Sequence, residues 1–127
     1  MPYETTLFQL PCGVQACRLE ARGDFSIEDT RQIYQQLASG GRLHGMPLLI
    51  LTHELSSITS DSRAAIVKVG REQAERWEAA VVTSTVLRVT INFIMRIQGR
   101  KKTKLFTSER EALQWLDARV GENAAGG

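Results

Sequence analysis

The segment MPLLILTHEL, residues 46–55, contains an unbroken run of four apolar residues from Leu48 to Leu51. A strand with one face in water alternates apolar and polar side chains, whereas a strand that is covered on both faces does not. The run therefore predicts a central strand that lies between two layers of other structure. A chain of 127 residues is expected to form a single domain around such a strand.

The segments before this run predict a hairpin and a helix. Residues 16–23 alternate between apolar and charged side chains, which is the pattern of a strand with one wet face. YETTLFQL, residues 3–10, is rich in strand formers and is followed by the breaker PCG, so the two strands are expected to form a hairpin. Residues 26–41 favour a helix with Ser26 as its cap.

Helices and strands continue to alternate after the run. Further helices are predicted at residues 60–77, 86–98 and 108–120, and further strands at residues 79–84 and 102–107. A hairpin followed by alternating helices and strands implies a mixed, mostly parallel sheet of about five strands with about four helices, which is an α/β fold. The domain is expected to cover residues 1–120, and the final GENAAGG, residues 121–127, is expected to be a flexible tail.

Composition, charge and cysteine content narrow the class of protein. The chain is 43% hydrophobic and 24% charged with a net charge of +2, which is typical of a globular domain and too weakly basic to indicate nucleic-acid binding. The N-terminus has no signal-peptide pattern, so a cytoplasmic protein is expected. Cys12 and Cys17 lack the second pair that a zinc site needs. They form either a disulfide across the hairpin or, as we expect in a reducing compartment, two free thiols.

Two segments carry a resemblance to a known superfamily. LLILTHELSSITSDSRAA, residues 48–65, and KLFTSEREALQWL, residues 104–116, resemble, together with the order of strands and helices, the STAS (anti-sigma factor antagonist, SpoIIAA-like) superfamily. The chain looks closest to an uncharacterised bacterial branch that ends in a Phe, an acidic helix start and an Ala-Leu-x-Trp-Leu pattern. The resemblance implies a SpoIIAA-like fold and a non-enzymatic regulatory or protein-interaction module.

The resemblance also implies a candidate phosphorylation site. In the anti-sigma factor antagonists, an Asp-Ser pair opens the helix after a buried strand, and a partner kinase phosphorylates the serine. Asp61 and Ser62 occupy the equivalent place, so Ser62 is a candidate phosphoacceptor and His53, Glu54 and Asp61 are candidate loop residues of the contact surface. A phosphate there would meet free N–H groups and the positive end of the helix dipole. The small residues and glycine of the family do not follow, and the alternative is that this turn is only an N-cap cluster.

No convergent set of catalytic residues can be assembled from the sequence. His53 and Glu54 end a buried strand and Ser62 follows nearby, but there is no G-x-S-x-G elbow to present a nucleophile. The glycines of ASGGRLHG, residues 38–45, are not followed by the lysine of a phosphate-binding loop. We therefore expect a protein without enzymatic activity, without a cofactor and without a metal.

The segment VLRVTINFIMRIQ, residues 86–98, is more apolar than a helix on the surface of a sheet requires. Its polar residues fall on one narrow stripe, and apolar residues cover most of the remaining circumference. Either all of these apolar residues belong to the core, or some contact a second copy of the chain or a protein partner. The candidates for such a contact are Leu87, Ile91, Phe93, Ile94 and Met95. The segment is too short and too interrupted to span a bilayer, which needs about 20 apolar residues.

A basic run follows this helix. Arg96, Arg100, Lys101 and Lys102 are candidate anion-binding residues, and beside an apolar pocket they would form its basic mouth. This arrangement gives the alternative function of a carrier or sensor of an apolar or anionic, lipid-like small ligand. A peripheral membrane contact is a weaker alternative, and nucleic acid is not expected because no aromatic residues interleave with the lysines. In the simplest case, the cations only complement the helix C-terminus and protect a sheet edge.

Overall fold

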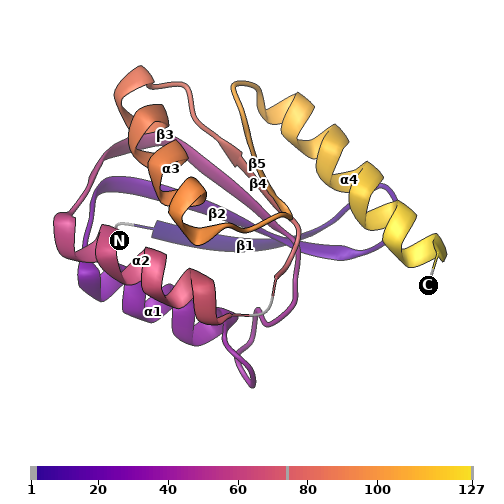
Figure 1. The fold of residues 1–127 in the computed structure, drawn as a ribbon. Helices are drawn as coiled ribbons and strands as arrows, with labels where there is room; N and C mark the ends of the chain where they lie inside the picture. The colour runs from indigo at the N-terminus through magenta and orange to yellow at the C-terminus, as the bar shows by residue number, and fades with distance from the viewer. Residues whose placement is uncertain (1–2, 74, 127) are drawn as a thin grey trace.

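The computed structural model describes residues 3–73 and 75–126, in which five strands and four helices follow one another (Figure 1). In chain order they are β1 (Tyr3–Gln9), β2 (Gln15–Phe25), α1 (Ile27–Leu37), β3 (Leu48–Ile58), α2 (Ser60–Glu72), β4 (Glu78–Val81), α3 (Thr85–Gln98), β5 (Thr103–Phe106) and α4 (Glu109–Gly126). The strands form one sheet in the order β1-β2-β3-β4-β5. β1 and β2 pair antiparallel and the other neighbours pair parallel, so the predicted α/β class with a mixed, mostly parallel sheet is confirmed.

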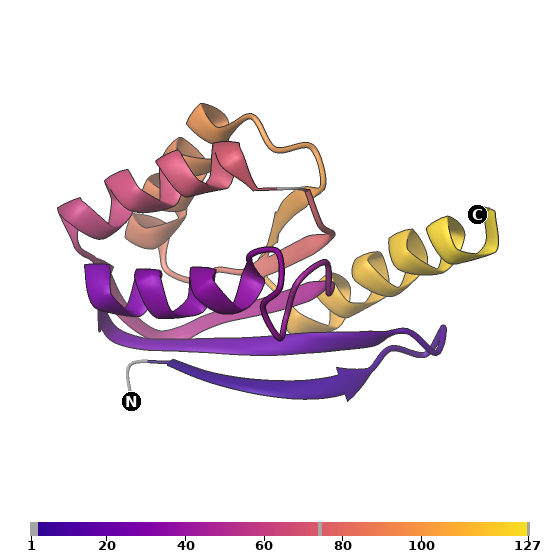
Figure 2. The ribbon, with the colours of Figure 1, turned by 90° about the horizontal axis from the view of Figure 1, so that it is seen from below.

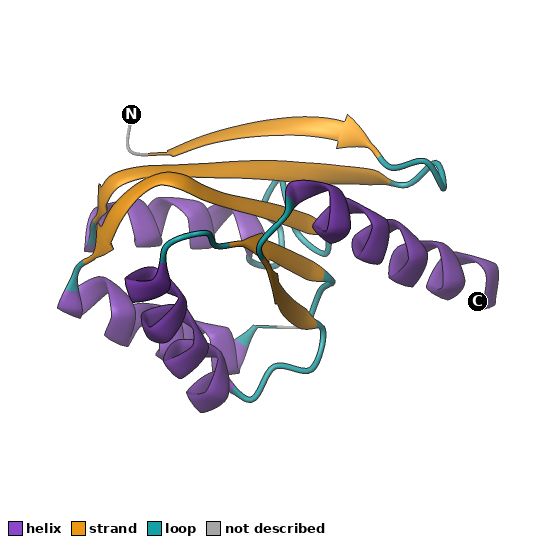
Figure 3. Cartoon of the chain, turned by 90° about the horizontal axis from the view of Figure 1, so that it is seen from above, coloured by secondary structure: helices purple, strands orange, loops and turns teal. Residues whose placement is uncertain are grey.

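Helices cover both faces of the sheet. α1, α2 and α3 pack on one face, and α4 packs on the other (Figures 1 and 3). Leu48 and Leu49 are neighbours in β3, and both are buried. Leu48 belongs to the core cluster beneath α1 and α3, and Leu49 belongs to the cluster beneath α4. The apolar run therefore forms the central, doubly covered strand that the sequence predicts.

β1 and β2 form the predicted hairpin, which runs along one side of the molecule in Figure 2. The apolar residues of β2 face the core, and the charged residues between them lie half-buried on the opposite face. There, Arg18 donates to Glu109 of α4 over 3.0 Å, and Nε of Arg22 lies 2.8 Å from a carboxylate oxygen of Glu54. The predicted wet face is thus a group of ion pairs, which contribute little to stability because solvent reaches them.

β3 is longer than predicted, because it continues through His53 and Glu54 to Ile58. Two register shifts interrupt its pairing with β2 along this extension. Such irregularities break the alternation of a strand, and His53 and Glu54 are accordingly both exposed. The two residues therefore lie within β3, and not at the end of the strand and the start of the loop before α2, as the sequence predicts.

The sequence predicts the start of α1 correctly, but it places the end of α2 too far along the chain. Ser26 and Asp29 form a capping box, in which the Ser26 hydroxyl accepts from the Asp29 N–H over 3.3 Å and the Asp29 carboxylate accepts from the Ser26 N–H over 2.8 Å. α2 ends at Glu72 and does not reach residue 77 as predicted. The chain becomes extended at Gln73 and enters β4, which places Arg76 in the interior.

α4 is longer than the predicted helix, because it runs to Gly126. Gly121 does not end it, since a glycine inside a helix costs only about 1 kcal/mol relative to alanine. An ion pair of 3.5 Å between Arg119 and Glu122 spans the position. Most of the segment predicted as a tail, residues 121–127, is therefore helical.

The two cysteines are free thiols, so the disulfide alternative is not formed. Cys12 is exposed in the hairpin turn, whereas Cys17 is buried in β2, where burial raises the pKa of its thiol. Because the thiolate is the reactive species, we expect the thiol reagent DTNB to modify one equivalent of the native protein rapidly and the second only after unfolding. Two rapid equivalents would show that β2 opens, and no rapid equivalent would indicate a disulfide.

Candidate functional site

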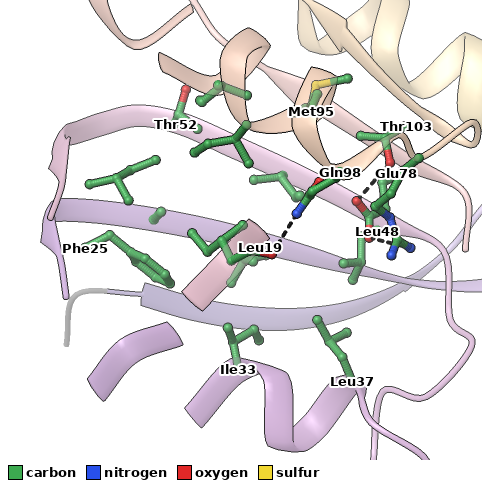
Figure 4. A pocket seen from close by; sticks show the side chains of 18 of the residues that line it. Leu19, Phe25, Ile33, Leu37, Leu48, Thr52, Glu78, Met95, Gln98 and Thr103 are labelled. Atoms are coloured by element: carbon green, nitrogen blue, oxygen red, sulfur yellow. Dashed lines mark hydrogen bonds and ion pairs between the residues drawn. The ribbon is translucent and has the colours of Figure 1, made fainter. Parts of the chain in front are cut away.

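A cavity of about 160 Å³ lies between the sheet and the helices α1, α2 and α3. Its walls are mostly apolar; the apolar residues labelled in Figure 4 are Leu19, Phe25, Ile33, Leu37, Leu48 and Met95. Protein interiors contain few voids larger than a water molecule, and an engineered apolar cavity of about 150 Å³ takes up benzene. The cavity therefore has the size of a small organic molecule.

Three charged residues also line the cavity: Arg76, Glu78 and Arg100. Their side chains are 4%, 12% and 5% exposed. Nη1 of Arg76 lies 2.6 Å from Oε1 of Glu78, and Nη2 of Arg100 lies 3.7 Å from the same oxygen. A single carboxylate thus sits between two guanidinium groups in a place that solvent hardly reaches.

Further hydrogen bonds hold this charged group in position. Nη2 of Arg76 donates to the side-chain oxygen of Gln73 over 2.5 Å, and the Thr103 hydroxyl donates to Oε2 of Glu78 over 3.2 Å. Nε of Arg76 is buried and meets no acceptor among the residues that the structure describes. Buried polar groups are normally paired, so this N–H is an unusual feature of the cavity lining.

Tyr34 of α1 lines the cavity as well. Burial raises the pKa of its hydroxyl to about 12, the Glu78 carboxylate adds to the increase, and the guanidinium groups of Arg76 and Arg100 oppose it. The phenol therefore keeps its proton at physiological pH and remains a hydrogen-bond donor.

Strand alternation explains how Arg76 and Glu78 reach the cavity. They flank Trp77, and successive residues of an extended chain point to opposite faces. Trp77 accordingly lies on the α4 side, where its ring centroid is 5.7 Å from that of Trp115. Nζ of Lys102 lies 5.1 Å from the centroid of the Trp77 ring on the same side.

Gly70 of α2 leaves space for the side chain of Gln98 beside the cavity. A Cβ at this position would lie 2.2 Å from Nε2 of Gln98. That amide donates to the carbonyl oxygen of Ile66 over 2.8 Å, and the Gly70 carbonyl accepts from Nη1 of Arg100 over 2.7 Å. The glycine that weakens the helical pattern therefore makes room for the Gln98 side chain that lines the cavity.

The structure distributes the predicted contact residues of α3 between the core, the cavity and the surface. Leu87 and Ile94 are buried, whereas Ile91 and Met95 are partly buried. Ile91, Ile94 and Met95 line the cavity. Four of the five candidates therefore face the interior, and their predicted role in contacting a partner stays a prediction.

Phe93, the fifth candidate, points outward and is 64% exposed. Val86 and Val89 are exposed with it, at 77% and 67%, although the sequence pattern does not single them out. The three residues are spaced i, i+3 and i+7, so they share one side of the helix, which we call the α3 outer face. Within the described residues, none of the helices combines the length and apolar character that crossing a membrane requires.

The four predicted anion-binding residues do not lie together. Arg100 lines the cavity, Arg96 and Lys101 are exposed, and Lys102 lies over Trp77 on the other side of the sheet. The charged residues that lie beside Arg100 in the cavity are instead Arg76 and Glu78, which the sequence analysis does not single out. The sequence signal that could have identified these two residues is a pair of opposite charges on either side of Trp77, at the start of a buried strand.

Ser62, the candidate phosphoacceptor, is fully buried, and its hydroxyl contacts the hydroxyl of Thr30 in α1. Asp61 is exposed at the start of α2. The Thr59 hydroxyl donates to its carboxylate over 2.6 Å and lowers the pKa of that group, and the Ser62 N–H donates over 2.9 Å. A kinase needs the serine hydroxyl in solvent, so phosphorylation of Ser62 stays a prediction that requires α2 to separate locally from α1.

His53 and Glu54 lie on the opposite face of the sheet from Ser62. With Arg18 and Arg22 they line a second, smaller cavity of about 110 Å³. The structure therefore does not assemble His53, Glu54 and Ser62 into one group. Among the described residues, no cluster of three or more His, Cys, Asp or Glu side chains is placed to hold a metal ion.

Comparison with known proteins shows the fold and the family. The structure of an uncharacterised DUF3478-family protein from Shewanella loihica PV-4, which has a SpoIIAA-like fold, is similar to the chain with a TM-score of 0.68. The match covers 90% of this chain and 93% of that one at 19% identity, so it shows the fold alone and confirms the expected SpoIIAA-like fold. No curated protein matches the chain. A family described as a domain of unknown function, DUF7793, matches residues 8–119, and the chain belongs to this family.

Proposed function

We propose that the protein is a non-enzymatic module that binds a small, largely apolar molecule in the cavity. The observation that carries the proposal is the cavity itself, with its volume of about 160 Å³ and its apolar walls. Apolar side chains that line an unfilled space lack packing partners on that side. A bound ligand would restore the lost packing contacts, and this is the physical reason for expecting one.

The chemistry of the lining supports binding rather than catalysis. The Thr52 hydroxyl donates to the carbonyl oxygen of Val81 over 2.7 Å, and the Thr103 hydroxyl donates to the Glu78 carboxylate. Neither hydroxyl is therefore a free nucleophile. No histidine or cysteine is found among the described lining residues. An activated nucleophile needs a neighbouring base that is free to take its proton, and Glu78 is held by Arg76.

Titration with 1-octanol tests this proposal. We expect 1-octanol to bind in calorimetry and to raise the melting temperature, because its chain fills the cavity. Ala80→Leu places a larger side chain in the lining and is expected to abolish binding. Ala118→Leu, on the exposed side of α4, is the matched control and is expected to retain binding. The absence of binding to the natural protein, or equal binding to a folded Ala80→Leu variant, would contradict the proposal.

A second function, association through the α3 outer face, is favoured by the exposed side chains of Val86, Val89 and Phe93. Apolar side chains that lie together on a surface mark interaction sites more often than scattered ones do. The partner would be a second copy of the chain or another protein. Sedimentation of the natural protein and of Phe93→Asp, a comparison developed in the Discussion, tests this function.

α3 connects the two functions, since it lines the cavity with Ile91 and Met95 and carries Phe93 on its other side. A ligand that fills the cavity would change how tightly α3 packs on the sheet, and association through the outer face would respond. This coupling is the regulatory role that we propose for the SpoIIAA-like fold in this chain. It requires that saturating 1-octanol shifts the sedimentation coefficient of any associated species.

A further inference from the structure

We propose that the ligand of the cavity is a neutral molecule in which an apolar chain carries one oxygen acceptor, such as the carbonyl group of a ketone, and that the Tyr34 hydroxyl donates to this oxygen. This inference rests on the proposed ligand-binding function and adds the chemical class of the ligand. It is carried by a hydroxyl of the lining that has no partner, by the hydrogen bonds of the charged residues, and by the shape of the cavity.

The Tyr34 hydroxyl is a polar group that the lining leaves available. Tyr34 lines the cavity from α1, and no hydrogen bond joins its hydroxyl to another of the described residues. Unlike Nε of Arg76, the Tyr34 oxygen is not closed off from molecules of the size of water. A phenol can donate one hydrogen bond and accept others, so a molecule in the cavity can use this group.

The Tyr34 hydroxyl acts toward a ligand as a donor at the charged end of the cavity. Its pKa, about 12, responds to the charges of Glu78, Arg76 and Arg100, so the hydroxyl lies near these residues. The group keeps its proton at neutral pH. A ligand that displaces water from the O–H must supply an acceptor in its place, or affinity is lost.

The hydrogen bonds of the charged residues favour a neutral head group. Arg76 donates through Nη1 to Glu78 over 2.6 Å and through Nη2 to Gln73 over 2.5 Å. Nη1 of Arg100 donates to the Gly70 carbonyl oxygen over 2.7 Å, and its Nη2 lies 3.7 Å from the Glu78 carboxylate. These residues are engaged with one another, so a charged head group would lose its hydration without gaining a counter-charge of its own.

The shape of the cavity separates a polar end from an apolar end. In Figure 4, Glu78 and Thr103 lie together on one side, whereas Phe25 lies on the opposite side. A ligand whose oxygen accepts from Tyr34 near Glu78 would therefore extend its chain toward Phe25, along walls that are mostly apolar. The volume of about 160 Å³ suits a chain of about six to eight carbon atoms, because a cavity of about 150 Å³ holds benzene.

Three probes with eight carbon atoms test the class of ligand: 2-octanone, 1-octanol and octanoate, titrated calorimetrically at neutral pH. The first two present a neutral oxygen and are expected to bind. Octanoate is expected to bind at least about tenfold more weakly than 2-octanone, because its charge gains no counter-charge in the cavity. If octanoate binds as tightly as 2-octanone, the neutral class is wrong while the cavity function stands. If none of the three binds, the proposed function fails with it.

Substitution of Tyr34 assigns the head group to its site. Tyr34→Phe removes only a hydroxyl that has no partner among the described residues, so the variant is expected to fold. It should weaken the binding of 2-octanone about fivefold, which is the effect of one net hydrogen bond. Tyr3→Phe is the matched control and should keep the full affinity, because the Tyr3 hydroxyl donates to Gln32 and Tyr3 does not line the cavity.

Infrared spectroscopy of bound 2-octanone supplies a second readout. A hydrogen bond from Tyr34 weakens the carbonyl bond, so the stretching band is expected at a lower frequency in the natural protein than in Tyr34→Phe. Unchanged affinity for 2-octanone in folded Tyr34→Phe, or a band at the same frequency in both proteins, would overturn the assignment of the head group to Tyr34.

Discussion

Replacing Glu78 by glutamine is expected to reduce the free energy of unfolding by about 3–5 kcal/mol. Glutamine keeps the size of the side chain but removes its charge. Arg76 and Arg100 then remain as two cations, with side chains that are nearly buried and without the carboxylate that lies 2.6 Å and 3.7 Å from them. Urea unfolding followed by circular dichroism measures the loss.

Glu72→Gln is the matched control for this prediction, because Glu72 is exposed at the end of α2. A surface substitution of this kind is expected to change stability by no more than about 0.5 kcal/mol. A loss below about 1 kcal/mol in Glu78→Gln would mean that water reaches the two guanidinium groups, contrary to the burial described above.

The parts of the fold that could be predicted are those in which local sequence and tertiary environment agree. The run from Leu48 to Leu51 has no polar residue, so only a doubly covered strand can bury it, and β3 is that strand. Ser26 and Asp29 satisfy each other within one turn, so the start of α1 does not depend on distant residues. The SpoIIAA-like order of elements follows from such local signals added along the chain.

The candidate site could not be predicted in the same way. Arg76 and Glu78 stand in the polar segment ERWE, and charged residues are almost never buried unless they are paired. Their partner Arg100 comes from the connection between α3 and β5, so their burial follows from the assembled sheet and not from local sequence. The basic run after α3 does contain Arg100, but nothing in its composition separates this residue from the exposed Lys101.

Two further differences between the prediction and the structure also arise from tertiary contacts and not from local sequence. The extension of β3 through His53 and Glu54 depends on register shifts against β2, which a single strand pattern does not contain. The rotation of α3 about its axis is also undetermined by its own residues. When a helix is apolar on most sides, its period shows which residues share a side, but not which side meets the sheet.

The orientation of α3 about its axis leads to the second prediction of a large change in stability. Leu87→Asp should reduce the free energy of unfolding by at least about 4 kcal/mol or leave the protein unfolded, because Leu87 is 5% exposed and packs in the core cluster with Leu48 and Val82. Phe93→Asp introduces the same charge on the same helix, but Phe93 is 64% exposed. It should change stability by no more than about 0.5 kcal/mol. Urea unfolding of both variants measures the difference.

The same pair of variants separates the two functions of α3. If the α3 outer face binds a second copy, folded Phe93→Asp sediments as a monomer where the natural protein sediments as a dimer, because a buried carboxylate is not tolerated in an apolar contact. Binding of 1-octanol should persist in Phe93→Asp, since Phe93 does not line the cavity. An equally large loss of stability in both variants would show that Phe93 belongs to the core and that the α3 outer face is not an exposed surface. An unchanged sedimentation coefficient would exclude self-association through the α3 outer face, and the cavity would remain as the functional site of the chain.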